Sequence, residues 1–261
     1  MGILNVTPDS FSDGGQFSSF ELACQHADEM VNQGATIIDI GGESTRPGAE
    51  PVSVEEELQR VIPLVKYVVE HHDVWISVDT SKAEVMAQAI AAGAHLINDV
   101  CALQQPNALQ VAAKLDVPVC LMHMQGQPKT MQDQPQYQDV VDDIILFFKQ
   151  RIDAAIAAGI KPHNIIIDPG FGFGKTLSHN YQLLAQLDRF NVLSAPLLIG
   201  LSRKSMIGTL LQCDVLERDN GSVVAAMIAV QKGAHILRVH NVKSTVEMLR
   251  IMDATRNYHS I

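Results

Sequence analysis

The stretch NQGATIIDIGG, residues 32–42, contains the pattern from which the fold can be worked out. A helical segment ends at Gly34, a short apolar run follows, and the run carries the polar residue Asp39 near its end. Glycine suits the left-handed backbone position just after many helices, and β-branched residues such as Ile37 favour strands. The stretch therefore predicts a helix that ends at Gly34 and a strand directly after it.

The same pattern recurs along the chain. It is found again in AAGAHLINDV (91–100), AAGIKPHNIIIDPG (157–170) and QKGAHILRVH (231–240). Other short apolar runs fit between these stretches: GILNV (2–6), DVWISVD (73–79), VPVCLMH (117–123) and APLLIGLS (195–202). Helical patterns separate the runs, so the chain alternates between strand and helix eight times.

This alternation predicts an α/β fold. Strands that are apolar throughout are typical of a parallel sheet buried on both faces. Eight strand–helix units indicate a (β/α)8 TIM barrel, for which about 250 residues is a typical length, and the chain has 261. A doubly wound open sheet is the alternative. Because no linker interrupts the sequence, a single domain over residues 1–261 is expected.

One of the expected helices, over residues 53–72, carries its own start signal. Ser53 and Glu56 have the spacing of a capping box. Pro63 is expected to kink or break this helix because it lacks the backbone N–H. The other helices are expected at residues 18–33, 82–92, 107–115, 138–158, 178–189, 204–212, 218–232 and 243–256.

Composition excludes several classes of protein. The formal net charge of −10 argues against nucleic-acid binding, which requires a basic face. The four cysteines are scattered with no Cys-x-x-Cys pair, so reduced thiols in a cytoplasmic protein are expected. Apolar runs are only a few residues long, and we therefore expect neither a signal peptide nor contact with a membrane.

Polar residues stand near the end of almost every expected strand. In a barrel, the active site forms at the C-terminal ends of the strands. One such residue is usually a cap or a turn, but a whole set on one face indicates a functional face. The set comprises Asn5, Asp39 with Glu43, Asp79, Asn98 with Asp99, His123, Asp168, Ser202 with Arg203 and Lys204, and Arg238 with His240.

The chemistry of this set favours a particular kind of ligand. Asp79, Asn98 and Asp168 suit a flat molecule with several N–H donors and one carbonyl group. Positive charge from Arg46, Lys204, Arg238 and His240 indicates that part of the ligand is anionic. Asn5 offers a carbonyl oxygen to Mg²⁺, which takes few protein ligands.

The stretch NIIIDPGFGFGKT, residues 164–176, resembles a phosphate-binding loop at first sight. The strict phosphate-loop pattern needs glycine where Pro169 stands. Proline also removes an N–H that such a loop would aim at phosphate. Nucleotide binding is therefore disfavoured, and Asp168 is of more interest than the glycines.

Two long loops follow the first two expected strands. NVTPDSFSDGG (5–15) and GGESTRPGAEP (41–51) are rich in Gly, Ser, Asp and Pro. Long loops at an active face are often lids. Each carries potential ligand contacts, Phe11 in the first and Thr45 with Arg46 in the second.

The chain resembles the dihydropteroate synthase family, which consists of bacterial pterin-binding TIM-barrel enzymes of folate synthesis. The resemblance runs from residue 2 to about 245, and it rests on motifs in the family's order: GILNVTPDSFSDGG, IDIGGESTRPGA, SVDTSK, INDV, LMHMQGQPKTMQ, DPGFGFGK, GLSRKS and RVHNV. It implies condensation of 6-hydroxymethyl-7,8-dihydropterin diphosphate with p-aminobenzoate, giving 7,8-dihydropteroate and diphosphate. Sulfonamides compete with p-aminobenzoate in this family. Its members usually have residues before the first strand, so either side chains alone close the lower end of the barrel or this chain lacks a natural N-terminal segment.

The family also implies roles for individual residues. Asp168 pairs with the amino-pyrimidine edge of the pterin, Asn98 and Asp79 contact the rest of its polar edge, and Lys204 and Arg238 lie at its other side and its face. Met122 and Phe173 form walls. The diphosphate lies at Asn5 (through Mg²⁺), Thr45, Arg46, Arg238 and His240. The p-aminobenzoate lies at Phe11, Thr45, Pro47, Phe173 and Ser205. The catalytic residues are Arg46, Lys204, Arg238 and His240.

Other functions remain as alternatives. A methyltetrahydrofolate–corrinoid methyltransferase shares the pterin-binding acids but has no use for a diphosphate cluster. A non-catalytic pterin-binding paralogue should have lost Lys204, Arg238 or His240, all of which are present. The resemblance also implies a homodimer, which we expect to form through exposed apolar residues on the last two or three helices.

Overall fold

The computed structural model describes residues 1–6, 16–44, 50–126, 131 and 135–260. Within these residues the strands follow one another in parallel, and each lies inside one of the predicted apolar runs. They are β1 Gly2–Asn5, β2 Ile37–Gly41, β3 Trp75–Asp79, β4 Leu96–Asp99, β5 Val119–Met122, β6 Ile165–Asp168, β7 Leu198–Ile199 and β8 Ile236–Leu237.

Hydrogen bonds close the strands into a ring. Strands β1 to β6 pair in chain order, and β7 pairs with β8. The Ile167 N–H donates to Pro196 O at 3.0 Å, which joins β6 to the start of β7, and the Ile3 N–H donates to Val239 O at 3.1 Å, which joins β1 to the end of β8. The strand order never reverses, so the doubly wound alternative is wrong and the fold is a TIM barrel.

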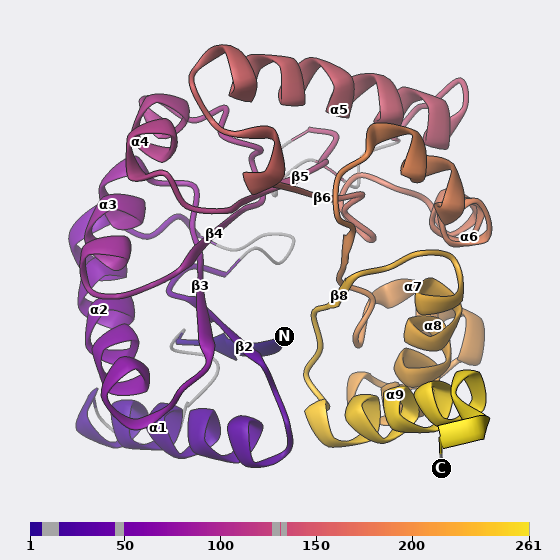
Figure 1. Ribbon diagram of the computed structural model, residues 1–261, viewed down its shortest axis with the longest axis horizontal. Coiled ribbons are helices and arrows are strands. Elements are labelled where there is room, and N and C mark those ends of the chain that lie inside the picture. The colour runs from indigo at the N-terminus through magenta and orange to yellow at the C-terminus, as the bar shows by residue number, and fades with distance from the viewer. Residues whose placement is uncertain (7–15, 45–49, 127–130, 132–134, 261) are drawn as a thin grey trace.

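Helices surround this ring (Figure 1). Short 3-10 segments also occur, η2 Pro162–Asn164, η3 Leu187–Leu193, η4 Val215–Glu217 and η5 Tyr258–Ser260. No helix in the described part of the chain has the length and apolarity that crossing a membrane requires. The α-helices are α1 Gln16–Asn32, α2 Val54–His71, α3 Ala83–Ala91, α4 Ala108–Leu115, α5 Val140–Ala157, α6 Leu177–Ala185, α7 Ser205–Leu211, α8 Asp219–Gln231 and α9 Val242–Arg256.

Glycine ends the helices that precede four of the strands, as predicted. The residues Gly34, Gly93, Gly159 and Gly233 have φ of +98°, +109°, +106° and +100°. A side chain is strained at such angles, which explains why glycine recurs in the repeated pattern.

Helix α2 corrects two details of the prediction. Ser53 accepts the Glu56 N–H at 3.1 Å, but the Glu56 side chain pairs with Arg60 rather than returning to the cap. The predicted break at Pro63 is wrong, because α2 runs unbroken from Val54 to His71. The helix buries a row of apolar side chains that includes Leu64, and this packing offsets the hydrogen bond that proline removes.

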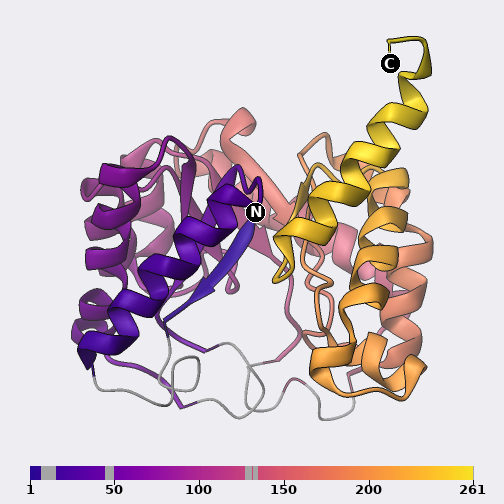
Figure 2. The ribbon, with the colours of Figure 1, turned by 90° about the horizontal axis from the view of Figure 1, so that it is seen from below.

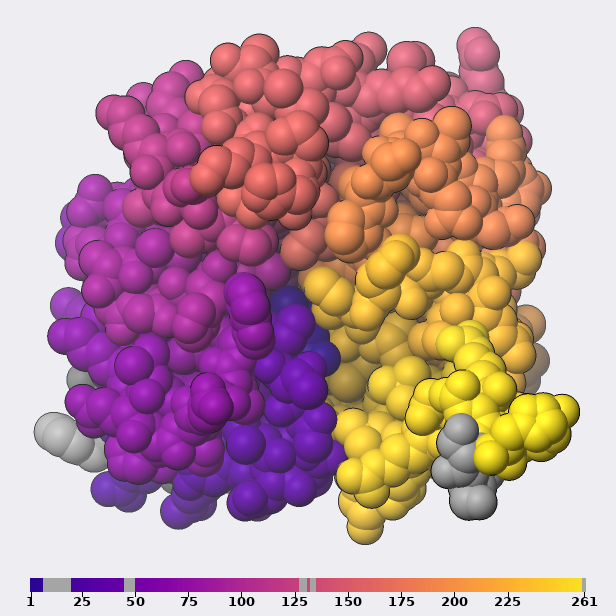
Figure 3. All heavy atoms as spheres, in the orientation of Figure 1, coloured from indigo at the N-terminus to yellow at the C-terminus, as the bar shows by residue number. Residues whose placement is uncertain are grey.

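The inside of the barrel is apolar at the end where the strands begin. Leu96, Cys120, Ile166 and Leu198 form one buried cluster, against which Met1 and Ile236 pack. We call these six residues the floor. Figure 3 shows this face of the molecule, with the N-terminal residues recessed at its centre. In Figure 2, strand β1 runs from this face toward the opposite one, and α9 projects away on the floor side.

Candidate active site

A cavity of about 440 Å³ lies at the end of the barrel opposite the floor, where the strands finish. Every predicted site residue within the described part of the chain lines it: Asn5, Asp79, Asn98, Met122, Asp168, Phe173, Lys204, Ser205, Arg238 and His240. The other predicted site residues, Phe11, Thr45, Arg46 and Pro47, lie outside the described residues. Residues far apart in sequence thus meet in one cavity because the strands end side by side.

Arg238 joins the acids of two neighbouring strands. Its Nε lies 2.5 Å from Asp39 Oδ2, and its Nη2 lies 2.7 Å from Asp79 Oδ2. Asn98 Nδ2 donates to the same oxygen of Asp39 at 3.2 Å. The parallel register of β3 and β4 places Asp79 beside Asn98. Closure of the ring then brings Arg238, which follows β8, to Asp39 and Asp79.

This network perturbs the acidity of its members. Burial raises the pKa of Asp79 to about 7; Arg238 opposes the rise, and Asp39 and Asp99 add to it. Burial acts to lower the pKa of Arg238, but the nearby carboxylates of Asp39 and Asp79 outweigh it and raise that pKa. The guanidinium therefore stays charged, whereas Asp79 can exchange between hydrogen-bond donor and acceptor near neutral pH.

Asp168 stands at the end of β6 and begins a glycine-rich turn. Its Oδ1 accepts the Gly170 N–H at 2.8 Å. Burial raises the pKa of Asp168, while the Gly170 bond and the charge of Lys204 oppose the rise. A carboxylate held in this way presents its second oxygen to a ligand in a fixed direction.

Lys204 lies against the same turn. Its Nζ is 4.1 Å from the centre of the Phe173 ring, a cation–π contact. A side chain at Gly172 would lie 3.2 Å from Lys204 Cδ, at a backbone φ of +81°. Burial lowers the pKa of Lys204 to about 8, and Asp168 opposes that change.

Ser202 and Arg203 support the end of β7. The Ser202 hydroxyl lies 3.0 Å from Nδ1 of His240 and accepts the His240 N–H at 3.1 Å, which holds the imidazole ring. Arg203 binds Asp219 through two bonds of 2.7 and 3.1 Å. This pairing ties the turn before α7 to helix α8.

Three polar residues of the predicted functional face have structural roles. Asp99 accepts the N–H groups of Cys101 and Leu103 at 2.8 and 2.7 Å, so it caps a turn. His123 contacts Lys175 instead of lining the cavity. Glu43, which follows β2, accepts the N–H of Val52, which precedes α2, at 2.9 Å.

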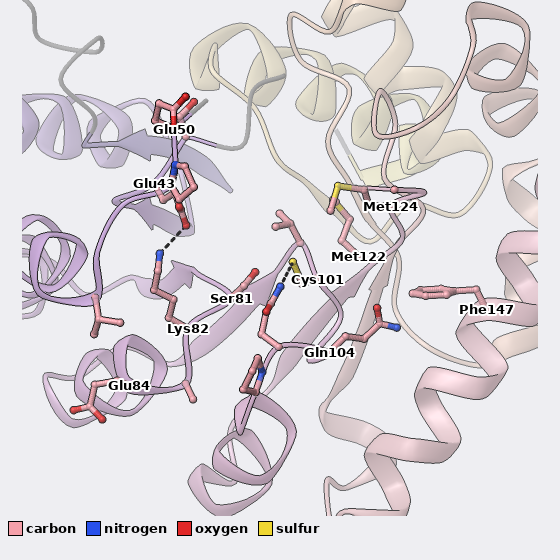
Figure 4. Close-up of a pocket in the computed structure, with 18 residues that line it drawn as sticks. Glu43, Glu50, Ser81, Lys82, Glu84, Cys101, Gln104, Met122, Met124 and Phe147 are labelled. Carbon is pink, nitrogen blue, oxygen red and sulfur yellow. Dashed lines mark hydrogen bonds and ion pairs between the residues drawn. The ribbon is translucent and has the colours of Figure 1, made fainter. Parts of the chain in front are cut away.

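A larger cavity of about 780 Å³ lies beside the first and shares Val100 and Met122 with it. Figure 4 shows Glu43 and Lys82 facing one another at its edge, with 2.7 Å between Nζ and Oε2. Lys82 also pairs with the fully buried Glu57. Of the described residues to which the family resemblance assigns a role, only Met122 lines this cavity, so the smaller cavity is the candidate active site.

Some important residues had no assigned role in the sequence. Asp39 was noted only as a strand-end residue, yet it is fully buried and holds Arg238. An acid inside an otherwise apolar run was the available signal. Lys175 stands in the stretch that resembles a phosphate-binding loop, which gives it no role of its own, and nothing in the local sequence indicates that Glu57 is buried.

The fold and the cavity agree with the comparisons to known proteins. Residues 1–240 match the family of pterin binding enzymes. The chain therefore belongs to the pterin-binding enzymes, a class defined here by a TIM barrel with acids, an amide and cations at the ends of its strands.

Similar proteins narrow the family further. The dihydropteroate synthase of Escherichia coli K12 is 58% identical over 255 residues, which cover 98% of this chain and 90% of that protein. The Yersinia pestis dihydropteroate synthase, solved as a sulfonamide drug complex, has a TM-score of 0.94 at 58% identity, covering 98% of this chain and 93% of that one. The Xanthomonas albilineans enzyme, solved with 4-aminobenzoic acid, has a TM-score of 0.94 at 52% identity, covering 98% and 92%. Within the pterin-binding enzymes, the chain belongs to the dihydropteroate synthases.

Proposed function

We propose that this enzyme joins the pterin of 6-hydroxymethyl-7,8-dihydropterin diphosphate to p-aminobenzoate, forming 7,8-dihydropteroate and releasing diphosphate. One observation carries the proposal. A single cavity gathers Asp168, Asn98 and Asp79, which suit a pterin edge, beside Lys204 and Arg238, which suit an anion. The relatives solved with 4-aminobenzoic acid and with a sulfonamide support the second substrate and a sulfonamide-sensitive site.

Pterin recognition rests on the acids and the amide. The Asp168 carboxylate can accept two parallel N–H bonds from the amino-pyrimidine edge. Asn98 and Asp79 supply mixed donors and acceptors for the remaining polar edge. Lys204 and Arg238 complete the enclosure, with Met122 and Phe173 as apolar walls.

Diphosphate binding rests on Arg238, His240 and Asn5, together with Thr45 and Arg46. The described residues contain no group of three or more His, Cys, Asp or Glu side chains suited to a metal. A site with few protein ligands, such as the one at Asn5, still fits Mg²⁺. This ion binds through one or two protein oxygens and keeps its other positions for water and phosphate. Asn5 would hold it, and the ion would supply positive charge to the departing diphosphate.

The reaction begins with cleavage of the C–O bond at the pterin methylene group, and the electron pair leaves with diphosphate. Arg238 and His240 stabilise that charge because they are already in place when it develops. The aniline nitrogen of p-aminobenzoate, neutral at pH 7, then forms the new C–N bond and loses its proton to an oxygen of the released diphosphate. Exclusion of water protects the pterin cation from conversion to the alcohol.

The p-aminobenzoate site lies beside Phe173 and the start of α7. Ser205 is the first residue of α7 and Lys204 is its N-cap, so backbone N–H groups there can receive the carboxylate. Phe11, Thr45 and Pro47 are proposed to complete the pocket.

Release of diphosphate tests the proposed function. Addition of p-aminobenzoate to the enzyme with pterin diphosphate and Mg²⁺ should liberate diphosphate and form dihydropteroate, as measured by a coupled assay and by mass spectrometry. A corrinoid methyltransferase would release no diphosphate. A non-catalytic protein would bind the pterin without turnover.

We also propose that the enzyme is a cytoplasmic homodimer whose contact surface lies on the last helices. Large apolar side chains are exposed there, and such surfaces often mark interfaces. Sedimentation equilibrium should give twice the chain mass, and Leu216→Asp with Ile251→Asp should give monomers. The exposed side chains on α7, η4, α8 and α9 are Leu210, Leu211, Val215, Leu216, Val224 and Ile251.

A further inference from the structure

Lys175 is a buried lysine to which the proposed reaction assigns no role. Its side chain is 3% exposed, and it does not line the substrate cavity. Its Nζ donates to Gly170 O at 2.8 Å and to Phe173 O at 2.9 Å. The ring Nδ1 and the carbonyl oxygen of His123 lie 3.0 and 3.4 Å from the same atom.

These bonds hold both ends of one turn. The Phe173 N–H donates to Gly170 O at 3.1 Å, which closes the turn Gly170–Phe173. Gly170 has φ of +69°, and a side chain there would lie 2.0 Å from His123 O, so the turn is pressed against the end of β5. An ammonium behind the turn satisfies carbonyl groups that would otherwise be buried without enough donors.

The other side of the same turn carries groups that face the substrates. Phe173 lines the cavity, and the Lys204 ammonium lies over its ring at 4.1 Å. The Gly172 N–H donates to Asn180 Oδ1 at 2.7 Å, which anchors the middle of the turn to α6. The position of Phe173 is therefore set from behind the turn, where the Lys175 side chain donates to the carbonyl groups at both ends.

We propose that Lys175 is a positioning residue for the second substrate: its amino group fastens the turn Gly170–Phe173 so that the Phe173 ring meets p-aminobenzoate. The assignment of that substrate rests on the proposed function. Asp168, which recognises the pterin, has its backbone in strand β6 and is tied to the turn through the Gly170 N–H that its Oδ1 accepts, whereas Phe173 lies within the turn. Loss of Lys175 should therefore affect p-aminobenzoate more than the pterin.

Lys175→Met keeps an unbranched side chain that is one atom shorter and removes its donors. A displacement of about 1 Å in a reacting site can lower the rate by about 100-fold, so kcat/KM for p-aminobenzoate should fall by roughly 10- to 100-fold. Pterin affinity, measured by calorimetry, should match that of Lys161→Met, a control in an exposed pair with Asp116 at the opposite end of β6. Lys175→Arg, which keeps charge and donors, should recover part of the loss.

A double-mutant cycle with Phe173→Ala separates positioning from general damage to the fold. If Lys175 acts through Phe173, then Phe173→Ala combined with Lys175→Met should lose little more kcat/KM than Phe173→Ala alone. Additive losses, or an equal fall in pterin affinity, would overturn the proposal.

A crystal structure of Lys175→Met provides a readout that needs no turnover. The Phe173 ring should move away from its contact with Lys204, and an unmoved ring would refute the positioning role. This result and diphosphate release by the unmodified enzyme are independent, so failure of the proposed function and failure of the inference can be told apart.

Discussion

The two ends of the barrel interior are built from the same strands and have opposite chemistry. On β4, Leu96 belongs to the floor and Asn98 to the active site. On β6, Ile166 likewise belongs to the floor and Asp168 to the active site. Side chains two residues apart point to the same face of a strand, so one inward row changes from apolar to polar within two residues. The start of each strand supplies packing, and its end supplies ligand contacts.

The difference has an energetic consequence. Apolar side chains at the floor stabilise the barrel through burial, whereas buried acids at the other end are favourable only when paired. Arg238 supplies that pairing for Asp39 and Asp79. Substitutions at the floor should therefore change stability alone, whereas substitutions at the site should change binding and catalysis, and stability as well where they alter a buried acid or its partner.

The largest expected effect follows from removing Asp168, the proposed pterin-binding acid. Asp168→Ala should abolish pterin binding, because no other described carboxylate occupies the end of β6. Calorimetric titration with the pterin checks this, with Asp188→Ala, on a surface segment, as the control. Near-normal pterin affinity in Asp168→Ala would refute the assignment.

Arg238→Met should weaken both catalysis and the fold. Loss of one charge-stabilising group costs about 2–4 kcal/mol of transition-state stabilisation, or roughly 30- to 1,000-fold in rate. It also leaves Asp39 and Asp79 buried without their partner, which should cost about 3–5 kcal/mol of stability. Urea unfolding and kcat of the folded fraction measure the two effects, and Arg189→Met, in an exposed pair, should show neither.

Asp79 should make stability depend on pH. Because burial raises its pKa to about 7 from 3.8, the folded state holds this proton between those values while the unfolded state does not. Its contribution to stability is therefore present at low pH and is lost as pH rises toward 7. The stability of Asp79→Asn relative to that of the parent enzyme should therefore be higher at pH 8 than at pH 5. If the difference in melting temperature between variant and parent is the same at both pH values, the raised pKa of Asp79 is contradicted.

The smallest expected effect is at the floor. Ile166→Val removes one methyl group from the buried cluster and should lower the free energy of unfolding by about 0.5–1.5 kcal/mol. Pterin affinity and kcat should be unchanged, although Ile166 is only two residues from Asp168. A fall in pterin affinity would show that the two ends of the barrel are not independent.

Much of the fold could be predicted because its signals are local. Gly34 and Gly93 mark helix ends through a backbone angle that only glycine adopts easily, and the apolar runs after them became strands β2 and β4. Of the two outcomes predicted for Pro63, a kink or a break, the break is wrong because helix packing is not local. Tertiary contacts along α2 offset a defect that the isolated segment would not tolerate.

The sequence predicted which residues line the cavity better than it predicted the hydrogen bonds and ion pairs that connect them. Asp79, Asn98 and Asp168 could be placed together because strands of a barrel end at one face. The sequence contains no signal that distinguishes Asp99, which caps a turn, from Asp168, which lines the cavity. Both follow a buried strand, and only the path of the next segment separates them.

The sequence by itself determined the order of strands and helices and the polar residues at the strand ends, because periodicity and backbone preference act over a few residues. Tertiary structure decided which of those residues share a cavity, which serve as caps, and that Lys175 lies behind the turn that Phe173 occupies. The pairing of Arg238 with Asp39 joins residues 199 positions apart. Such a contact exists only because the barrel closes, and closure is a property of the whole chain.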